Sequence, residues 1–217
     1  MSKVIIVGAT GGVGSRLGPM LVKAGHTVTA LHRKPEQADE LTRAGMIPCE
    51  GDMMEMSAED FIGATKGMDI IVFSAGAAGS GLERTSMIDG EGVNKTIHAA
   101  KVNGISRMYL VSAFMDAGRE LPRKDGFEHY MKVKRQADNA LAASGLAWVI
   151  LRPGALISEA GDGSVNAGLA IPFGSVARGN VAAMLAALIE APDINREIIE
   201  LTDGDVPVQQ AVKGLRR

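Results

Sequence analysis

Short apolar runs alternate with amphipathic stretches along most of the chain. The runs, rich in Val, Ile and Leu, cover residues 4–7, 27–32, 46–50, 69–74, 107–112 and 146–151. Segments with apolar residues at helical spacing lie between them, at residues 12–25, 36–44, 58–64, 88–103 and 127–144. Short apolar runs separated by helices are typical of parallel strands that are covered on both sides. The pattern therefore predicts an α/β fold with a doubly wound parallel sheet and helices on both faces.

The pattern changes after residue 153. The segment 154–176 is rich in glycine and lacks a clear period, so we expect a substrate-side loop over the carboxyl edge of the sheet. A helix at 180–190, a strand at 197–201 and a short helix near 208–215 complete the predicted elements. Because no repeat, low-complexity segment or linker divides the sequence, we expect residues 1–217 to form one domain.

The composition is that of an ordinary globular protein and narrows the range of partners. Apolar residues make up 46% of the chain, charged residues 22%, and the net charge is −2. Because the basic residues are scattered or paired, we expect neither nucleic acid nor a membrane as a partner. The absence of a long apolar run and of a signal peptide predicts a cytoplasmic protein. We expect a small-molecule substrate, and a monomer or small homo-oligomer.

A glycine-rich turn follows the first predicted strand and opens the first helix. Glycines 8, 11 and 14 give the spacing G-x-x-G-x-x-G. In this context the backbone turns sharply, approaches a pyrophosphate and presents it to the helix N-terminus, and a Cβ would obstruct each step. We therefore predict a Rossmann-type dinucleotide site. Its expected contacts are Gly8, Thr10, Gly11, Gly12, Val13 and Gly14. The alternative is a turn whose glycines serve only its own geometry.

The end of the second predicted strand indicates which dinucleotide binds. An acidic residue about 20 positions after the turn would hold the 2′-hydroxyl of NAD. Here the strand ends instead in His32-Arg33-Lys34, with no acidic residue before Glu36. A guanidinium pairs well with the 2′-phosphate of NADP, so Arg33 favours NADP(H) over NAD(H). The alternative is a solvated basic pair at the end of a strand.

These motifs, and those that follow later strands, resemble the atypical short-chain dehydrogenases/reductases. That NAD(P)-binding group includes biliverdin-IXβ/flavin reductase and the NmrA-like sensors. The resemblance rests on Gly51-Asp52, Phe73-Ser74-Ala75-Gly76, Val111-Ser112-Ala113 and Leu151-Arg152-Pro153-Gly154. It implies that Asp52 lies by the adenine. Apart from the resemblance, Met53, Met54 and Met56 are candidates to border the cofactor cleft, with core filling as the alternative. The resemblance also implies that Ala75 and Gly76 line the middle of the cofactor, and that Pro153, Gly154 and Ala155 lie near the nicotinamide. Asp52 has an alternative role as a turn cap.

A Y-x-x-x-K pattern at Tyr130 and Lys134 supplies candidate catalytic groups. At i and i+4 on a helix, the two side chains share a face. In the family, the phenol donates a proton to a substrate carbonyl. The lysine lowers the pKa of that phenol and holds the ribose of the cofactor. A serine after the fifth strand, here Ser112, orients the substrate. The alternative is an ordinary surface pair. The histidines at 26, 32, 98 and 129 are dispersed, so we expect no metal site.

Three functions agree with these features. The first is an NADP(H)-dependent oxidoreductase that reduces a small carbonyl, quinone-like or flavin-like substrate by hydride transfer. The second is a non-catalytic NADP(H)-binding redox sensor. The third is a small NAD(P)-dependent epimerase or dehydratase, which is disfavoured because only about 60 residues follow the sixth strand, whereas such enzymes carry a larger substrate domain. The tyrosine–lysine pair favours catalysis over sensing.

Overall fold

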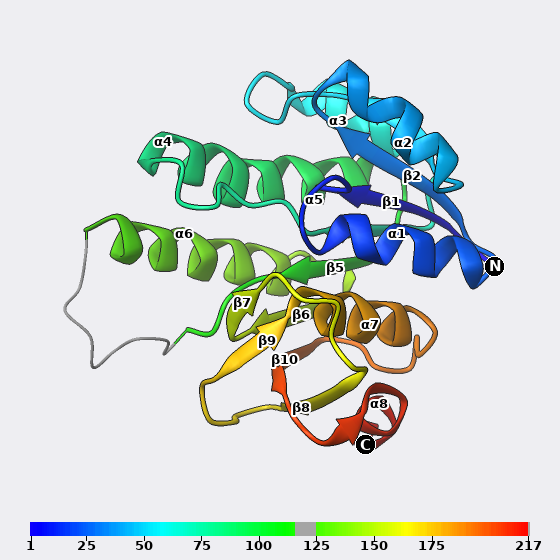
Figure 1. Cartoon of the computed structure of the whole chain (residues 1–217). Coiled ribbons are helices and arrows are strands. Elements are labelled where there is room, and N and C mark those ends of the chain that lie inside the picture. Colours follow the sequence, from blue (N-terminus) through cyan, green and yellow to red (C-terminus); the bar gives the residue numbers. More distant parts are fainter. Residues whose placement is uncertain (116–124, 217) are drawn as a thin grey trace.

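The fold is built around a nine-stranded, mostly parallel sheet in a computed structural model that describes residues 1–115 and 125–216. The strand order is β11-β8-β10-β6-β5-β4-β1-β2-β3 (Figure 1). The parallel strands are β1 (Lys3–Val7), β2 (Thr27–His32), β3 (Ile47–Glu50), β4 (Ile70–Phe73), β5 (Arg107–Val111), β6 (Ala147–Pro153) and β10 (Glu197–Asp203). The succession β3-β2-β1-β4-β5-β6 is the Rossmann order, so the predicted fold class is confirmed.

Helices cover both faces of this sheet. Side chains alternate along β1, so that Val4 and Ile6 enter one core while Ile5 and Val7 enter the other. The first core is closed by α1 (Gly14–Lys23), α2 (Ala38–Arg43), α7 (Arg178–Ile189) and α8 (Val208–Gly214). The second is closed by α3 (Ala58–Thr65), α5 (Gly92–Val102) and α6 (Asp125–Ala142). This two-sided burial explains why the parallel strands are almost continuously apolar.

The expectation of a long loop at 154–176 is wrong. The segment forms three strands, β7 (Ala155–Ile157), β8 (Ser164–Gly168) and β9 (Ser175–Ala177). Strand β8 runs antiparallel to β10 and is extended by β11 (Val206–Pro207), whereas β7 and β9 pair in a separate parallel ribbon. These strands are too short and too rich in glycine to show a period. They are stabilised by hydrogen bonds to segments remote in sequence.

The helix predicted over 88–103 begins earlier than expected. A short helix α4 (Leu82–Arg84) leads into a π-helical segment η2 (Thr85–Glu91), which continues directly into α5. A 3-10 turn η1 (Pro35–Gln37) similarly precedes α2. The π-helical segment carries Asp89, which is only 1% exposed. Local π-helical geometry is frequent at functional sites, and here it places an acidic side chain inside the protein.

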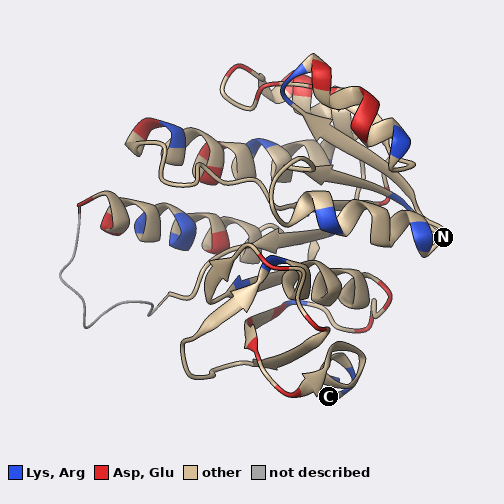
Figure 2. Cartoon of the chain, in the orientation of Figure 1, with Lys and Arg blue, Asp and Glu red and all other residues tan. Residues whose placement is uncertain are grey.

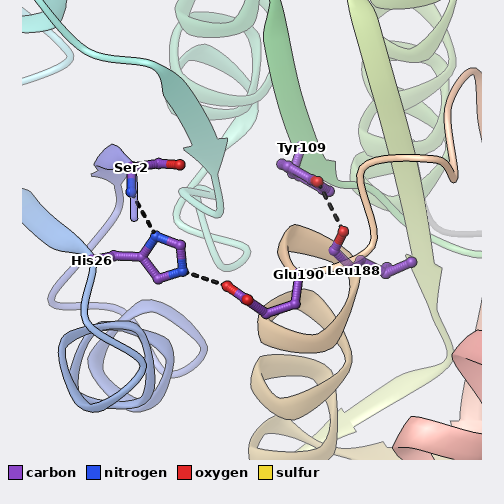
Figure 3. A network of polar contacts seen from close by, with 5 residues as sticks. All are labelled: Ser2, His26, Tyr109, Leu188 and Glu190. Atoms are coloured by element: carbon purple, nitrogen blue, oxygen red, sulfur yellow. Dashed lines mark hydrogen bonds and ion pairs between the residues drawn. The ribbon is translucent and has the colours of Figure 1, made fainter.

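A network of paired polar groups closes the amino edge of the sheet (Figure 3). The buried imidazole of His26 accepts a hydrogen bond from the backbone N–H of Ser2 and pairs with Glu190 at the end of α7. Nearby, the hydroxyl of Tyr109 on β5 donates to the carbonyl of Leu188, at a distance of 3.0 Å. These contacts join β1, β2, β5 and α7 where the strands begin.

The charged residues are spread over the molecule. Acidic and basic positions are interspersed along the helices (Figure 2). Among the described residues, none of the helices combines the length and apolarity needed to cross a membrane. Within the same residues, His, Cys, Asp and Glu side chains do not gather in groups of three or more that could hold a metal ion.

Candidate functional site

The glycines of the first turn divide into two pairs with different surroundings. Gly8 has φ +91°, and a Cβ there would lie 2.5 Å from the backbone nitrogen of Ala75. A Cβ at Gly14 would collide with the carbonyl oxygen of Gly8. These two glycines are therefore required by the turn itself, because β4 and the start of α1 approach it too closely for any side chain.

The other two glycines face outward. Gly11 and Gly12 are exposed, and a Cβ at Gly11 would meet only the carbonyl oxygen of Gly8, at 3.2 Å. Their backbone lies at the N-terminal end of α1, beside the exposed Thr10 and above the buried Val13. Open backbone at a helix N-terminus is a cradle that a Cβ would fill, which fits the pyrophosphate of a dinucleotide.

The adenosine side of the predicted site lies at the ends of β2 and β3. Arg33 is exposed just after β2, and within the described chain its guanidinium has no ion-pair partner. By contrast, Lys34 Nζ lies 3.8 Å from Glu36 Oε1 and forms an ion pair with it. Asp52 caps its own turn, because its Oδ1 accepts the N–H of Met54 at 2.9 Å. Met53 turns inward, with its methyl group beside Gly92 of α5.

Segments after β4 and β6 form the middle of the same edge. Ala75 lies against Gly8, and a Cβ on the exposed Gly76 would come within 3.3 Å of Asp89 Oδ1. Pro153 ends β6 and is buried. The N–H of Gly154 donates to the carbonyl of Leu201, and that of Ala155 donates to Gly174, both at 2.9 Å. The topology thus brings these predicted contacts to one edge of the sheet, although their cofactor roles stay predictions.

The predicted catalytic lysine is buried and already bonded. Lys134 is 2% exposed, and its Nζ donates to the carbonyl of Val111 at 2.8 Å. It also lies 3.4 Å from Asp89 Oδ1, while the other oxygen of Asp89 accepts the N–H of Ala77. The ammonium group therefore joins α6 to the end of β5 and to the π-helical segment η2.

Tyr130 lies one helical turn before Lys134 and is half-buried. The Lys134 Nζ is 6.0 Å from the centre of the Tyr130 ring. Burial raises the pKa of the Tyr130 phenol, and the carboxylates of Asp89 and Asp138 raise it further. The expectation that Lys134 lowers this pKa therefore stays a prediction. The amine is held by Asp89, whose negative charge opposes its effect. Tyr130 is therefore a neutral phenol, and these surroundings make it a weaker acid than a free tyrosine.

Ser112 and Asp138 form a buried polar pair beside the lysine. Asp138 is bound by Arg152, with Nη2 at 2.9 Å and Nε at 3.0 Å from its Oδ2. Burial raises the pKa of Asp138, while the hydroxyl of Ser112 and the guanidinium of Arg152 oppose that rise. Even so, Ser112 Oγ and Asp138 Oδ1 are the buried side-chain atoms of the described residues that lack a hydrogen bond of ordinary geometry. Such atoms are uncommon in protein interiors, where buried polar groups are normally hydrogen-bonded to protein, water or a bound group.

Sequence reasoning missed three charged residues of this edge. Asp138 lies four positions after Lys134 on the inward stripe of α6, and that spacing was a usable signal. Asp89 precedes Val93 and Ile97 at helical spacing, which also indicates the buried face of a helix. For Arg152, only its place in the motif after β6 pointed to the site.

Comparison with known proteins identifies the family. The model of a family described as NAD(P)H-binding matches residues 8–192. A Bacillus subtilis protein named an uncharacterized sugar epimerase, YhfK, is 36% identical over 98% of this chain and 100% of its own length. The solved structure of a proposed NAD-dependent epimerase/dehydratase from Bacillus halodurans has a TM-score of 0.89 and 30% identity, covering 99% of this chain and 100% of that one.

A third protein shares the fold at lower identity. The Escherichia coli protein ChuY, described as an anaerobillin reductase, has a TM-score of 0.76 and 24% identity, covering 95% of this chain and 98% of its own. The resemblance to Rossmann NAD(P)-binding reductases is confirmed. The family match spans most of the sequence and includes the exposed glycine turn after β1. This chain therefore belongs to the NAD(P)H-binding family, whose members are of the oxidoreductase and epimerase type.

Proposed function

We propose that this protein is an NADP(H)-dependent oxidoreductase that reduces a small carbonyl, quinone-like or flavin-like substrate. The observation that carries the proposal is the exposed backbone of Gly11 and Gly12 at the start of α1. It lies on the same sheet edge as the hydroxyl of Ser112, which lacks a hydrogen bond of ordinary geometry. A dinucleotide bound at the cradle extends along that edge toward the ends of β5 and β6. The nicotinamide, when bound, supplies the hydride.

The protein's own groups supply binding, orientation and a proton. The hydroxyl of Ser112 lies beside Asp138 without a hydrogen bond of ordinary geometry, so it can turn to bind a substrate oxygen. The phenol of Tyr130, on the same helix as Lys134, is the proposed proton donor to that oxygen. Lys134 is a positioning group in the free protein, since its ammonium ties Val111 to Asp89.

The preference for NADP(H) rests on Arg33. Its exposed guanidinium follows β2, next to the turn after β1, because Val7 pairs with Leu31 in the register of these strands. With no carboxylate paired to it in the described chain, it is available for the 2′-phosphate. Charge-assisted hydrogen bonds contribute roughly 1.5–3 kcal/mol each, which favours NADPH over NADH.

Epimerase or dehydratase activity is a second candidate. It is supported by the names of the Bacillus subtilis relative and of the Bacillus halodurans structure, both of which refer to an epimerase. The two activities differ in how they use the cofactor. A reductase consumes NADPH, whereas an epimerase returns the hydride to its substrate and leaves the cofactor unchanged.

The experiment joins cofactor titration to a turnover screen. NADPH and NADH are titrated into wild type, Arg33→Ala, Gly11→Val and the control Gly63→Val, which adds the same side chain in open space on α3. We expect NADPH to bind more tightly than NADH, Arg33→Ala to remove that difference, and Gly11→Val alone to abolish binding. Equal wild-type affinities would contradict the NADP(H) preference, and unchanged binding by Gly11→Val would contradict the cradle.

Turnover is then followed as NADPH oxidation with aldehydes, quinones and flavins. Steady oxidation with any of these classes supports the reductase. Tight NADPH binding without oxidation, together with interconversion of sugar epimers, would support the second candidate. Tight binding with neither reaction would favour a redox sensor.

A further inference from the structure

An arginine from a distant part of the chain lies directly on the glycine cradle. Arg178 is the first residue of α7, and its side chain covers the outer side of Gly12. A Cβ added to Gly12 would lie 2.7 Å from Arg178 Nε and would collide with Cδ. The space that glycine leaves open at this position is thus occupied by the arginine side chain, whose charged end lies where α1 begins.

The start of α7 is held firmly in this position. Asn180 is 2% exposed, and its side-chain amide donates to Asp203 Oδ1 at 2.8 Å and to the carbonyl of Ser164 at 3.0 Å. Its carbonyl oxygen accepts the N–H of Gly163 at 2.9 Å. The N–H of Ala177 donates to Asp203 as well. This scaffold fixes the backbone from which the Arg178 side chain extends over Gly12.

The charge at the cradle is not neutralised by the protein. Arg16 on α1 also reaches Gly12, donating from Nη1 to the carbonyl oxygen at 2.6 Å. Neither Arg16 nor Arg178 forms an ion pair within residues 1–115 and 125–216. By contrast, Arg152 on the same edge is paired with a buried carboxylate. Two unpaired guanidinium groups beside exposed backbone N–H groups are complementary to a phosphate-bearing ligand.

We propose that Arg178, assisted by Arg16, binds the pyrophosphate of the dinucleotide from the side opposite the glycine turn. The inference rests on the proposed cofactor site and deepens it. Because both nicotinamide dinucleotides contain the pyrophosphate, Arg178 sets the affinity for both and does not discriminate between them. Arg33 and Arg178 therefore have separable tasks, one at the 2′-phosphate and one at the pyrophosphate.

The test uses two truncated ligands beside the intact cofactors. ADP-ribose carries the pyrophosphate without the 2′-phosphate, and 2′-AMP carries the reverse. Dissociation constants for NADPH, NADH, ADP-ribose and 2′-AMP are measured by calorimetry for wild type, Arg178→Gln, Arg178→Lys and Arg33→Ala. Arg43→Gln, at the far end of α2, is the matched control for loss of one surface charge.

Arg178→Gln is expected to raise the dissociation constants of NADPH, NADH and ADP-ribose by a common factor of about ten to a hundred. The dissociation constant of 2′-AMP should stay unchanged. Arg178→Lys keeps the charge but not the bidentate geometry, so it recovers part of that loss. Arg33→Ala should show the reverse pattern, weakening only NADPH and 2′-AMP. Thermal unfolding without ligand, equal for wild type and Arg178→Gln, verifies that the fold is kept.

Two results would overturn the inference. Gly11→Val is measured with ADP-ribose as well. If Arg178→Gln binds ADP-ribose as tightly as wild type while Gly11→Val does not bind it, the cofactor site is supported but Arg178 has no role in it. If Arg178→Gln loses affinity only for 2′-AMP and NADPH, Arg178 lies at the adenosine end of the site instead. A Gly11→Val variant that binds ADP-ribose like wild type would instead remove the proposed cofactor site itself.

Discussion

Polar side chains at the two edges of the parallel sheet differ in how fully they are hydrogen-bonded. At the amino edge, Arg107 donates to Tyr109 Oη at 2.7 Å and to backbone carbonyls of residues 192 and 194, and Tyr109 donates to Leu188. His26 is bonded on both ring nitrogens (Figure 3). At the carboxyl edge, Ser112 Oγ is buried without a hydrogen bond, and Arg178 has no acidic partner among the described residues.

The contrast separates structural polar groups from those available to a ligand. A buried polar atom without a partner costs about 1–3 kcal/mol, so a protein retains few of them. Within the described residues these atoms are Ser112 Oγ and Asp138 Oδ1, and Ser112 lies at the carboxyl end of β5, the edge at which open α/β sheets bind their ligands. The polar groups named at the amino edge are all hydrogen-bonded, whereas the carboxyl edge combines bonded pairs such as Lys134–Asp89 with two buried atoms that lack a hydrogen bond of ordinary geometry. Three predictions test this contrast.

The largest expected effect is on turnover at the carboxyl edge. Tyr130→Phe removes the proposed proton donor but keeps the ring beside Phe127. General acid catalysis is typically worth 10²–10⁴-fold, so kcat is expected to fall by about that factor with little change in NADPH affinity. Steady-state kinetics with the best substrate from the screen measure it. Full activity of the variant would show that the proton comes from solvent.

The second effect is on stability at the same edge. Lys134→Met leaves the 1%-exposed carboxylate of Asp89 without its cation. Removing one partner of a buried pair costs about 3–5 kcal/mol, which denaturant unfolding measures. The double variant with Asp89→Asn removes both charges and is expected to recover much of the loss. Equal destabilisation of the single and double variants would show that the two side chains do not act as an ion pair.

The smallest effect compares one hydroxyl from each edge. Tyr109→Phe leaves the Leu188 carbonyl and the Arg107 Nε without their partner, so we expect a loss of about 1–3 kcal/mol in the free energy of unfolding. Ser112→Ala removes a hydroxyl that lies beside Asp138 without a hydrogen bond of ordinary geometry, and we expect a free energy of unfolding within about 0.5 kcal/mol of wild type. Similar costs for both hydroxyls would erase the distinction between the two edges.

The local features of the site followed from sequence because they depend on neighbouring residues. The strand before the turn, the positive φ of Gly104 and Gly145 where helices end, and the inward stripe of α6 all reflect local conformation or short periods. The segment 154–176 was mispredicted because its strands are held by β10 and by each other, and such pairing leaves no local period.

The sequence by itself determined the α/β class, the glycine turn and the order of motifs along the strands. Only the tertiary structure decided which glycines of the turn face outward, and that Lys134 is held by Asp89. Only the tertiary structure brought Arg178 onto Gly12. The physical reason is that backbone conformation and periodicity are local, whereas charge pairing and close approach depend on residues that fold together from distant parts of the chain.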